Sequence, residues 1–336
     1  MQKRLIAILT ASLLMAGIFL YFAADLYFYS IKPAGRLDYE PIIVTIAPGQ
    51  NFNKIVDDLS QHHLISSPLK FKLIARLKAY DRKIMTGEYA LSTPITPLAI
   101  LEALTNGKIR LHRLAIPEGF NIKQIAQRVE SSGFLRKEKF IKAATDPEFA
   151  KKMKIPAQTF EGYLFPDTYL FPKDITAKQI ITEMVKQFRM TFSDEWKKQA
   201  QSIGFSIHEI ITLASIIEKE TGVASERPVI ASVFHNRLKK NMRLASDPTV
   251  IYGIKNFNGN ITKKDLQRLT PYNTYMISGL PPGPIANPGA QSIKAALFPA
   301  KTNYLYFVAK RDKTHQFSET LKDHNRAVRK YQLRRR

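Results

Sequence analysis

One acidic residue lies where a core residue is expected. Ser206 and Glu209 form a capping box at the start of a helix that we predict over residues 206–221. At about 100° per residue the apolar side chains of this helix form one broad stripe, and Glu218 falls inside it, stacked on Ala214. Burial disfavours the ionised form of a carboxyl group, which is how enzymes keep a glutamic acid protonated for general-acid catalysis. Proton transfer is therefore one interpretation of Glu218.

Spacing alone favours a different interpretation of Glu218, a buried ion pair with an arginine such as Arg227 or Arg237. Glu220 points away from Glu218, so the two acids are not a paired-carboxylate site. The chain has no cysteine, and its seven histidines lack metal-ligand spacing. We therefore expect neither a metal nor another cofactor.

A membrane anchor is predicted at the N-terminus. The uncharged run over residues 5–24 is long enough, as a helix, to span the hydrocarbon core of a bilayer. Lys3 and Arg4 hold a cytoplasmic stub of residues 1–4, and the apolar run is too long for a typical cleaved signal peptide. We expect a single-pass protein of the bacterial cytoplasmic (inner) membrane, with a linker over residues 30–40 and all that follows on the periplasmic side.

The strong positive charge has several explanations. The formal net charge of +23 would ordinarily suggest nucleic-acid binding. Outside the cytoplasm that partner is not expected, whereas lipid headgroups and the carboxylates of wall peptides are acidic. A solvated basic surface that favours solubility is an equally good explanation.

A repeat with an offset of seventy residues follows the anchor. Gly49 and Asn51 in the first copy correspond to Gly119 and Asn121 in the second, and each copy reads strand, turn, amphipathic helix. Such units resemble LysM modules, which bind glycans that contain N-acetylglucosamine. We predict one LysM-like module over residues 41–110 and a second related α/β unit over residues 111–155, with compact spacers as the alternative.

A third and largest domain is expected over residues 156–336. Helical patterns occur over residues 177–193, 194–203, 206–221 and 225–240, and a strand over residues 304–308. The predicted fold class is thus α+β, with one transmembrane helix, small LysM-like modules and a larger mixed α+β catalytic domain.

Five blocks in this last domain carry a family resemblance. They are EGYLFPDTY (161–169), LASIIEKET (213–221), ASVFHNRL (231–238), MRLASDPTVIY (242–252), and YNTY (272–275) with GLPPGPI (279–285). The region from 160 to about 331 resembles the YceG-like endolytic murein transglycosylases. Two departures from the family pattern are Ala245, where a polar residue is expected, and His235, where an apolar one is usual.

The resemblance implies a reaction and a role for Glu218. Glu218 would protonate the glycosidic oxygen between N-acetylmuramic acid and N-acetylglucosamine in peptidoglycan glycan strands, then take the proton from the muramoyl 6-hydroxyl as a 1,6-anhydro ring closes. A positioned intramolecular hydroxyl makes a protein nucleophile unnecessary. The candidates for binding the sugar or stabilising its charge are the polar or acidic residues Asp247, Tyr252, Asn273, Tyr275 and Glu161.

Glu161 leaves other mechanisms open, because a second acid near Glu218 would permit a water-using muramidase. A non-catalytic scaffold that binds peptidoglycan and meets the wall synthases is a further alternative, and a charge-driven nucleic-acid binder is a third. The family also suggests action on nascent strands, which limits or terminates their elongation.

Overall fold

The computed structural model describes residues 2–34, 40–255 and 257–333, and the fold is mixed α+β with an apolar helix at its N-terminus. The chain divides into two compact units. Unit 1 comprises residues 1–112 and 170–174, and unit 2 comprises residues 113–169 and 175–336. The predicted α+β class is thus confirmed.

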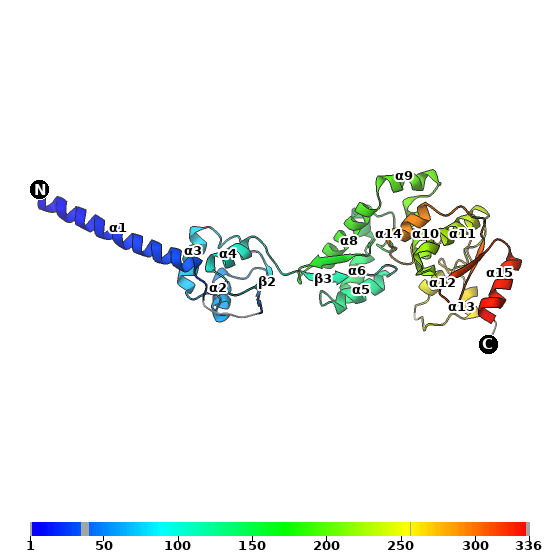
Figure 1. The fold of residues 1–336 in the computed structure, drawn as a ribbon, viewed down its shortest axis with the longest axis horizontal. Coiled ribbons are helices and arrows are strands. Elements are labelled where there is room, and N and C mark those ends of the chain that lie inside the picture. Colours follow the sequence, from blue (N-terminus) through cyan, green and yellow to red (C-terminus); the bar gives the residue numbers. More distant parts are fainter. Residues whose placement is uncertain (1, 35–39, 256, 334–336) are drawn as a thin grey trace. The chain divides into compact units, whose positions relative to one another are not determined.

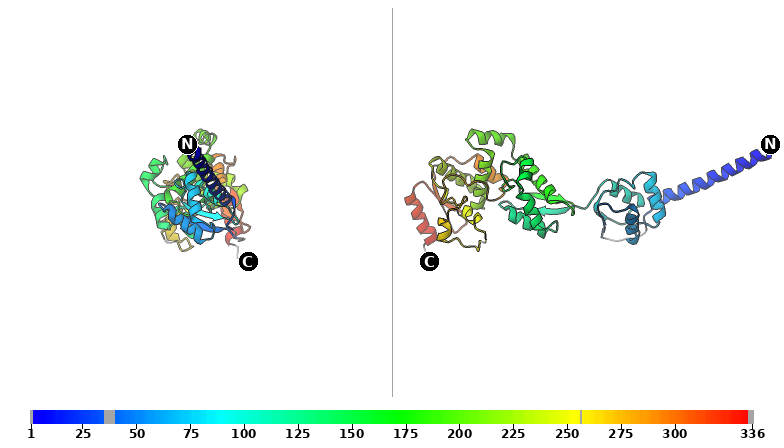
Figure 2. Two further views of the ribbon diagram at one scale, coloured as in Figure 1. Left: turned by 90° about the vertical axis from the view of Figure 1, so that its left-hand side faces the viewer. Right: turned by 180° about the vertical axis from the view of Figure 1, so that it is seen from behind.

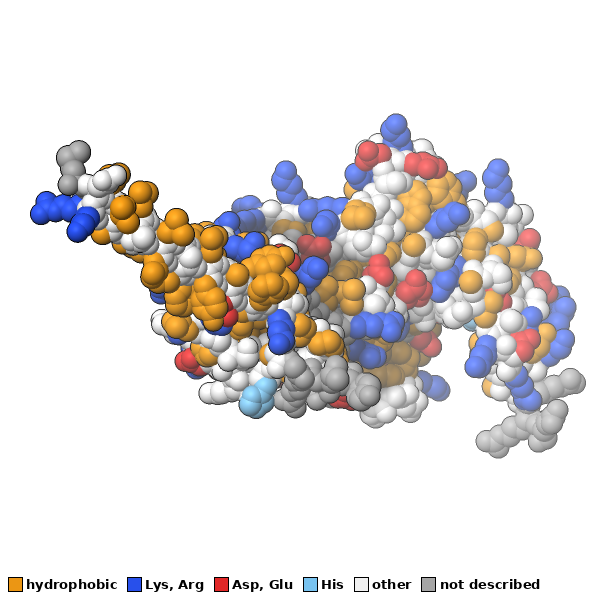
Figure 3. Space-filling model, turned by 60° about the vertical axis from the view of Figure 1, so that its left-hand side comes forward, with side chains coloured by type: hydrophobic (Ala, Val, Ile, Leu, Met, Phe, Trp, Pro, Cys, Tyr) orange, Lys and Arg blue, Asp and Glu red, His pale blue; other side chains and the backbone are white. Residues whose placement is uncertain are grey.

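The N-terminal helix α1 (Gln2–Ile31) extends beyond the predicted apolar run at both ends. It is long and apolar enough to cross a membrane, and none of its apolar stretch is buried against the rest of the protein. Figures 1 and 2 show α1 projecting from the rest of unit 1, and Figure 3 shows hydrophobic side chains along it with Lys and Arg at its tip. The predicted linker begins inside α1, and residues 35–39 of it lie outside the described residues.

The rest of unit 1 follows the order strand, helix, helix, strand, helix. These elements are β1 (Ile42–Ile46), α2 (Phe52–Gln61), α3 (Pro68–Leu77), β2 (Gly87–Leu91) and α4 (Pro97–Thr105). Strands β1 and β2 are antiparallel, with Ile42 opposite Leu91 and Ile46 opposite Gly87. Asn51 caps α2 as predicted, since its side chain accepts a hydrogen bond from the Asn53 amide. The helices bury their apolar faces in one core with the sheet.

The second copy of the repeat begins with β3 (His112–Ala115) and continues through α5 (Ile122–Ser131), α6 (Lys137–Ala144) and α7 (Pro147–Lys152). Asn121 caps α5 in a complete capping box with Gln124. Strand β3 pairs with β4 (Thr168–Phe171), which lies beyond residue 155. The second copy therefore has the same strand, helix, helix and returning strand as the first, with α7 inserted.

The remainder of unit 2 is mainly helical. Its elements are α8 (Ala177–Thr191), α9 (Asp194–Ser202), α10 (Ile207–Glu220), η1 (Ala224–Glu226), α11 (Arg227–Lys239), α12 (Asp247–Tyr252), α13 (Lys263–Gln267), α14 (Ala290–Leu297), β5 (Tyr306–Ala309), β6 (His315–Ser318), α15 (Leu321–Val328) and the π-helical turn η2 (Arg329–Leu333). Helix α10 is the central element, buried from Ile210 to Ile217 and packed against α14 and α11. The four helices predicted here are all present, within two residues of their expected ends.

Candidate active site

Glu218 lies on the last turn of α10, and the helix has the predicted capping box of Ser206 and Glu209. The side chain of Glu218 is only 6% exposed. It follows the fully buried Ile217 on the stripe that faces α14. The expectation that the Glu218 carboxyl group lies on the buried apolar face of this helix is thus confirmed.

Two donors hold the Glu218 carboxylate. The Arg227 Nη2 lies 3.5 Å from Oε1, and the Gly289 amide donates to Oε2 at 3.0 Å. Arg227 begins α11 and Gly289 caps α14, so the positive end of the α14 dipole also faces this carboxylate. The ion pair with Arg227 that spacing favoured is present, whereas Arg237 donates instead to the carbonyls of Leu244 and Leu305.

A second carboxyl group, which sequence reasoning missed, belongs to Glu118. It lies in the turn after β3, and its Oε2 is 3.6 Å from the same Arg227 Nη2. Partial burial and the negative charge of Glu218 raise the pKa of Glu118, and Arg227 offsets part of that rise. In the seventy-residue repeat Glu118 occupies the place of Pro48 in the first copy, and this difference between the copies could have identified it.

Two glycines allow these groups to approach each other. A Cβ at Gly289 would overlap the Glu118 carboxylate, and a Cβ at Gly119 would lie 3.3 Å from Glu218 Cγ. Gly119 has a φ of +74°, a conformation that favours glycine. The Lys219 Nζ donates to the Gly119 carbonyl at 3.3 Å, which fixes the turn against α10. The Arg227 Nε is buried without a hydrogen-bond partner among the described residues, so the guanidinium has a spare donor.

Glu161 lies in a separate buried group. Its carboxylate accepts hydrogen bonds from the Ile122 amide, from Asn287 Nδ2 at 3.0 Å and from the Tyr252 hydroxyl at 3.2 Å. Burial raises the pKa of Glu161 to about 7 despite these donors. Among the described residues no hydrogen bond or ion pair joins Glu161 to Glu218. Glu161 and Tyr252 both line a pocket of about 420 Å³, which also includes Phe257.

Asp247 and Tyr275 form a further pair of polar residues. The Tyr275 hydroxyl donates to Asp247 Oδ1 at 2.7 Å, and burial together with Asp247 raises the pKa of Tyr275. Nearby, Ser246 Oγ donates to Glu220. Burial and the charge of Asp247 raise the pKa of Glu220 to about 7. Glu220 and Glu218 thus have different partners, as their positions on the helix predict.

Asn273 is fully engaged within its own loop. Its buried Nδ2 donates to the carbonyls of Arg268, Leu266 and Asp265, and its Oδ1 accepts from the Tyr275 amide. These bonds shape the loop that presents Tyr275.

The two departures from the family pattern, Ala245 and His235, are accommodated in the fold. Ala245 adopts a φ of +47°, and its amide donates to the Thr274 carbonyl. His235 Nε2 bonds the Ala296 carbonyl at 2.8 Å, and its ring packs against Phe205. Both positions therefore have a structural role in this fold.

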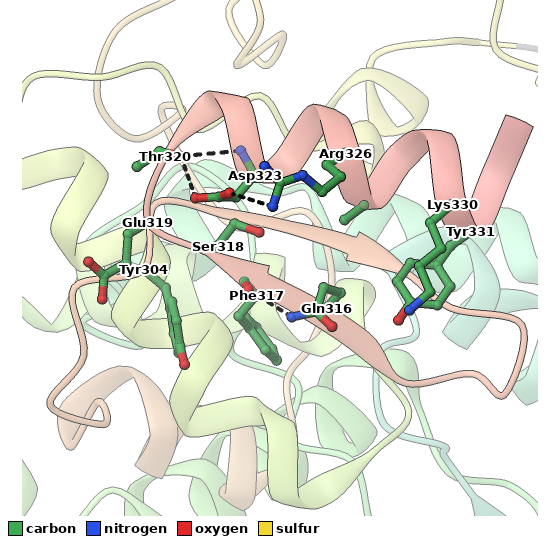
Figure 4. Close-up of a pocket in the computed structure, with 11 residues that line it drawn as sticks. Tyr304, Gln316, Phe317, Ser318, Glu319, Thr320, Asp323, Arg326, Lys330 and Tyr331 are labelled. Carbon is green, nitrogen blue, oxygen red and sulfur yellow. Dashed lines mark hydrogen bonds and ion pairs between the residues drawn. The ribbon is translucent and has the colours of Figure 1, made fainter.

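A further pocket lies at the C-terminal end of unit 2. Its volume is about 440 Å³. Figure 4 shows Gln316 and Phe317 from β6 and Asp323 and Arg326 from α15 around it. Asp323 bonds Thr320 and forms an ion pair with Arg326 at 3.5 Å, so its charge is engaged within the first turns of α15. In the described part of the chain this pocket shares no residue with the Glu218 group, which remains the better site for chemistry.

Comparison with known proteins shows to which family the chain belongs. The model of the YceG-like family matches residues 44–330, which include nearly all of the first copy of the repeat, the second copy and the whole Glu218 group. The chain belongs to the YceG-like family.

Relatives in this family extend over most of the chain. An endolytic murein transglycosylase of Bacillus subtilis is 34% identical, with 95% of this chain and 91% of the relative covered. One of Streptococcus pneumoniae is 29% identical over 92% of this chain, which spans only 61% of that longer protein. A crystal structure of a YceG-like protein from Listeria monocytogenes has 37% identity and a TM-score of 0.60, covering 86% of this chain and all of the other.

Proposed function

We propose that this chain is an endolytic murein transglycosylase that cleaves the bond between N-acetylmuramic acid and N-acetylglucosamine without water. The observation that carries the proposal is the buried Glu218 carboxyl group, held by Arg227 and by the amide of Gly289. Membership of the YceG-like family and the names of its relatives support the same reaction.

Glu218 acts twice in the proposed reaction. As an acid it gives its proton to the glycosidic oxygen, and the C1–O bond of the muramoyl residue breaks. As a carboxylate it then takes the proton of the muramoyl 6-hydroxyl, whose oxygen bonds to C1 and closes the 1,6-anhydro ring. Arg227 and the Gly289 amide stabilise the carboxylate between the two steps, because both donate to its oxygens.

Glu118 has an electrostatic role in this proposal. Positive charge develops at C1 as the glycosidic bond breaks. The half-exposed Glu118 carboxylate, joined to Glu218 through Arg227, places a negative charge at the mouth of the site. It therefore favours the oxocarbenium-like transition state over the neutral ground state.

The other predicted residues divide into two kinds. Tyr252, beside the pocket of about 420 Å³, and Tyr275 with Asp247 present hydroxyl and carboxylate groups suited to binding sugar hydroxyls. Glu161 and Asn273 act by holding their loops in place, since their polar atoms are engaged within the protein.

The N-terminal half serves the same function. Helix α1 anchors the protein in the cytoplasmic membrane with residues 1–4 inside, and the rest of the chain after α1 lies on the periplasmic side. The strand-helix-helix-strand copies are LysM-like modules that bind glycan, which brings nascent strands to the site near the synthases that extend them. Cleavage there would end strand elongation.

Mass spectrometry of digests of uncrosslinked glycan strands tests the reaction. The unmodified protein should yield 1,6-anhydro ends, and Glu218→Gln should yield none. The matched control is Glu209→Gln, which alters an exposed carboxyl group at the start of the same helix. Strand cleavage by the Glu218→Gln protein would remove the site assignment, and inactivity of the unmodified protein would favour a binding scaffold.

A water-using muramidase is the second candidate, and Glu118 is the observation that favours it. Hydrolytic glycosidases use two carboxyl groups, and Glu118 supplies the second beside Glu218. Reducing ends in the same digest, with incorporation of solvent ¹⁸O, would establish hydrolysis. Absence of the label with anhydro ends would exclude it.

A further inference from the structure

Helix α3 in unit 1 presents a stripe of leucines to solvent. Leu69, Leu73 and Leu77 are 79%, 47% and 70% exposed, and they recur every fourth residue along one side of the helix. The opposite side carries Phe71, Ile74 and Ala75, all buried in the core of the unit. The leucines therefore contribute nothing to that core, and their exposure calls for a partner outside it.

The same helix is strongly basic. The segment over residues 67–78 contains four cationic residues, Lys70, Lys72, Arg76 and Lys78, and no acidic residue. A short helix that combines an apolar stripe with flanking lysine and arginine is typical of elements that lie in a membrane interface. Figure 3 shows hydrophobic side chains along α1, and hydrophobic side chains with Lys and Arg among them on the rest of the surface of unit 1.

Contacts with α1 fix the level of α3 along the anchor. The Tyr29 hydroxyl donates to the Ser67 carbonyl at 2.9 Å, and Lys70 Nζ forms an ion pair with Asp25 at 2.7 Å. Leu26 and Tyr29 also pack against the core of the unit. The start of α3 is thus joined to the segment of α1 that directly follows the apolar run.

That level coincides with the headgroup layer. The apolar run over residues 5–24 accounts for about 30 Å of helix, the thickness of the hydrocarbon core. Asp25 and Tyr29 then fall within the next ~8 Å, where lipid headgroups lie. The Lys70 side chain pairs with Asp25, which lies nearer to the apolar run than Tyr29 does. Around the axis of α3, Leu73 and Leu77 lie within about 60° of Lys70. The leucine stripe therefore faces the bilayer.

We propose that the exposed face of α3, formed by Leu69, Leu73 and Leu77, lies in the anionic surface of the bilayer that α1 enters. This inference rests on the proposed anchoring by α1. The leucines enter the boundary between headgroups and acyl chains, and Lys72 and Arg76 contact lipid phosphates. Unit 1 is then held at the membrane by two elements, α1 and α3, which restricts its rotation and tilt.

The chain has no cysteine, so a single introduced cysteine can be labelled selectively. The full-length Leu73→Cys protein would carry an environment-sensitive NBD fluorophore in liposomes of phosphatidylglycerol and phosphatidylethanolamine. Nitroxides on the lipids, placed near the headgroup or deep in the chain, quench a label according to its depth. Lys54→Cys, exposed on α2, is the control for water, and Leu14→Cys, in the middle of α1, is the control for the bilayer core.

The label at position 73 should show blue-shifted emission and be quenched more by shallow nitroxides than by deep ones. Its quenching should fall when phosphatidylglycerol is replaced by phosphatidylcholine, because the basic flank loses its anionic partner. The label at position 14 should be quenched most by deep nitroxides, and that at position 54 by neither.

Three outcomes would overturn the inference in distinguishable ways. A label at position 73 that behaves like the one at position 54, with position 14 quenched, refutes the role of α3 and leaves the anchor intact. A blue-shifted label at position 73 that lipid nitroxides do not quench means that another protein surface covers the leucines. An unquenched label at position 14 refutes the anchoring itself, and the inference with it.

Discussion

Replacement of Gly289 by alanine should isolate the contribution of Glu118. The backbone of Gly289 has φ −76° and ψ 168°, which alanine adopts without strain, and its amide can still donate to Glu218. The added Cβ would overlap the Glu118 carboxylate, which belongs to a flexible side chain that is 47% exposed. We therefore expect Glu118 to leave Arg227 while Glu218 keeps both of its donors.

The loss in rate follows from the geometry. Glu118 Oε2 and Glu218 Oε1 lie 3.6 and 3.5 Å from the same Arg227 nitrogen, so they are at most about 7 Å apart. The positive charge at C1 develops beside Glu218, so we take this separation as the scale of the distance from Glu118 to C1. At an effective dielectric constant of about 20, the attraction between unit charges at that distance contributes about 2 kcal/mol. Solvent around the half-exposed Glu118 reduces this to about 1 kcal/mol, which corresponds to a roughly fivefold fall in kcat. Stability should change by less than ~1 kcal/mol, because alanine restricts the unfolded chain and offsets the lost ion pair.

The assay is the initial rate of release of anhydro ends, measured beside the thermal midpoint. Gly283→Ala is a matched control, since a Cβ there meets His208 only at the ordinary distance of 3.5 Å. Glu118→Gln should reproduce the loss, and the double variant Glu118→Gln with Gly289→Ala should be no slower than either single variant. Full activity of Gly289→Ala beside an impaired Glu118→Gln would refute the reasoning, as would additive losses in the double variant.

Three further substitutions probe other groups. Burial raises the pKa of Glu220 from 4.5 to about 7, so its contribution to stability is complete below 4.5 and is lost as pH rises through 7; Glu220→Gln should flatten the fall in thermal midpoint over that range. Asn273→Ala removes the three hydrogen bonds that Nδ2 donates and the one that Oδ1 accepts, and should lower the unfolding free energy by about 1–3 kcal/mol, measured by urea denaturation. Gly119→Ala should reduce kcat more than Gly133→Ala, because both glycines have positive φ but only the first added Cβ approaches Glu218; equal losses would contradict this.

Local signals in the sequence predicted the helices well. The caps Asn51, Asn121 and Ser206 each accept the expected hydrogen bond in the structure, because a capping side chain satisfies amides only a few residues away. The position of Glu218 on the buried stripe of α10 follows from helix periodicity in the same way. These features depend on short stretches of chain, so no knowledge of tertiary packing was needed.

The partners of Glu218 could not be found so directly. Glu118 precedes it by one hundred residues and Gly289 follows it by seventy-one, and only the folded chain brings Glu118 to Arg227 and the Gly289 amide to Glu218. No pattern over a few residues encodes such a meeting. Arg227 could be predicted as a partner because it lies only nine residues from Glu218, at the start of the next helix.

The contacts made by the turn after β3 determine where the chain can be truncated without losing part of the proposed site. Glu118 and Gly119 reach Arg227, Glu218 and Lys219 from this turn, and the Ile122 amide just beyond it bonds Glu161. A fragment that begins at residue 156, the start of the largest domain expected from sequence, would lack these contacts and leave the Glu161 carboxylate buried without one of its donors. The shortest fragment that keeps every contact of the proposed site therefore begins near residue 113, so the second copy of the repeat belongs to the same compact unit as Glu218.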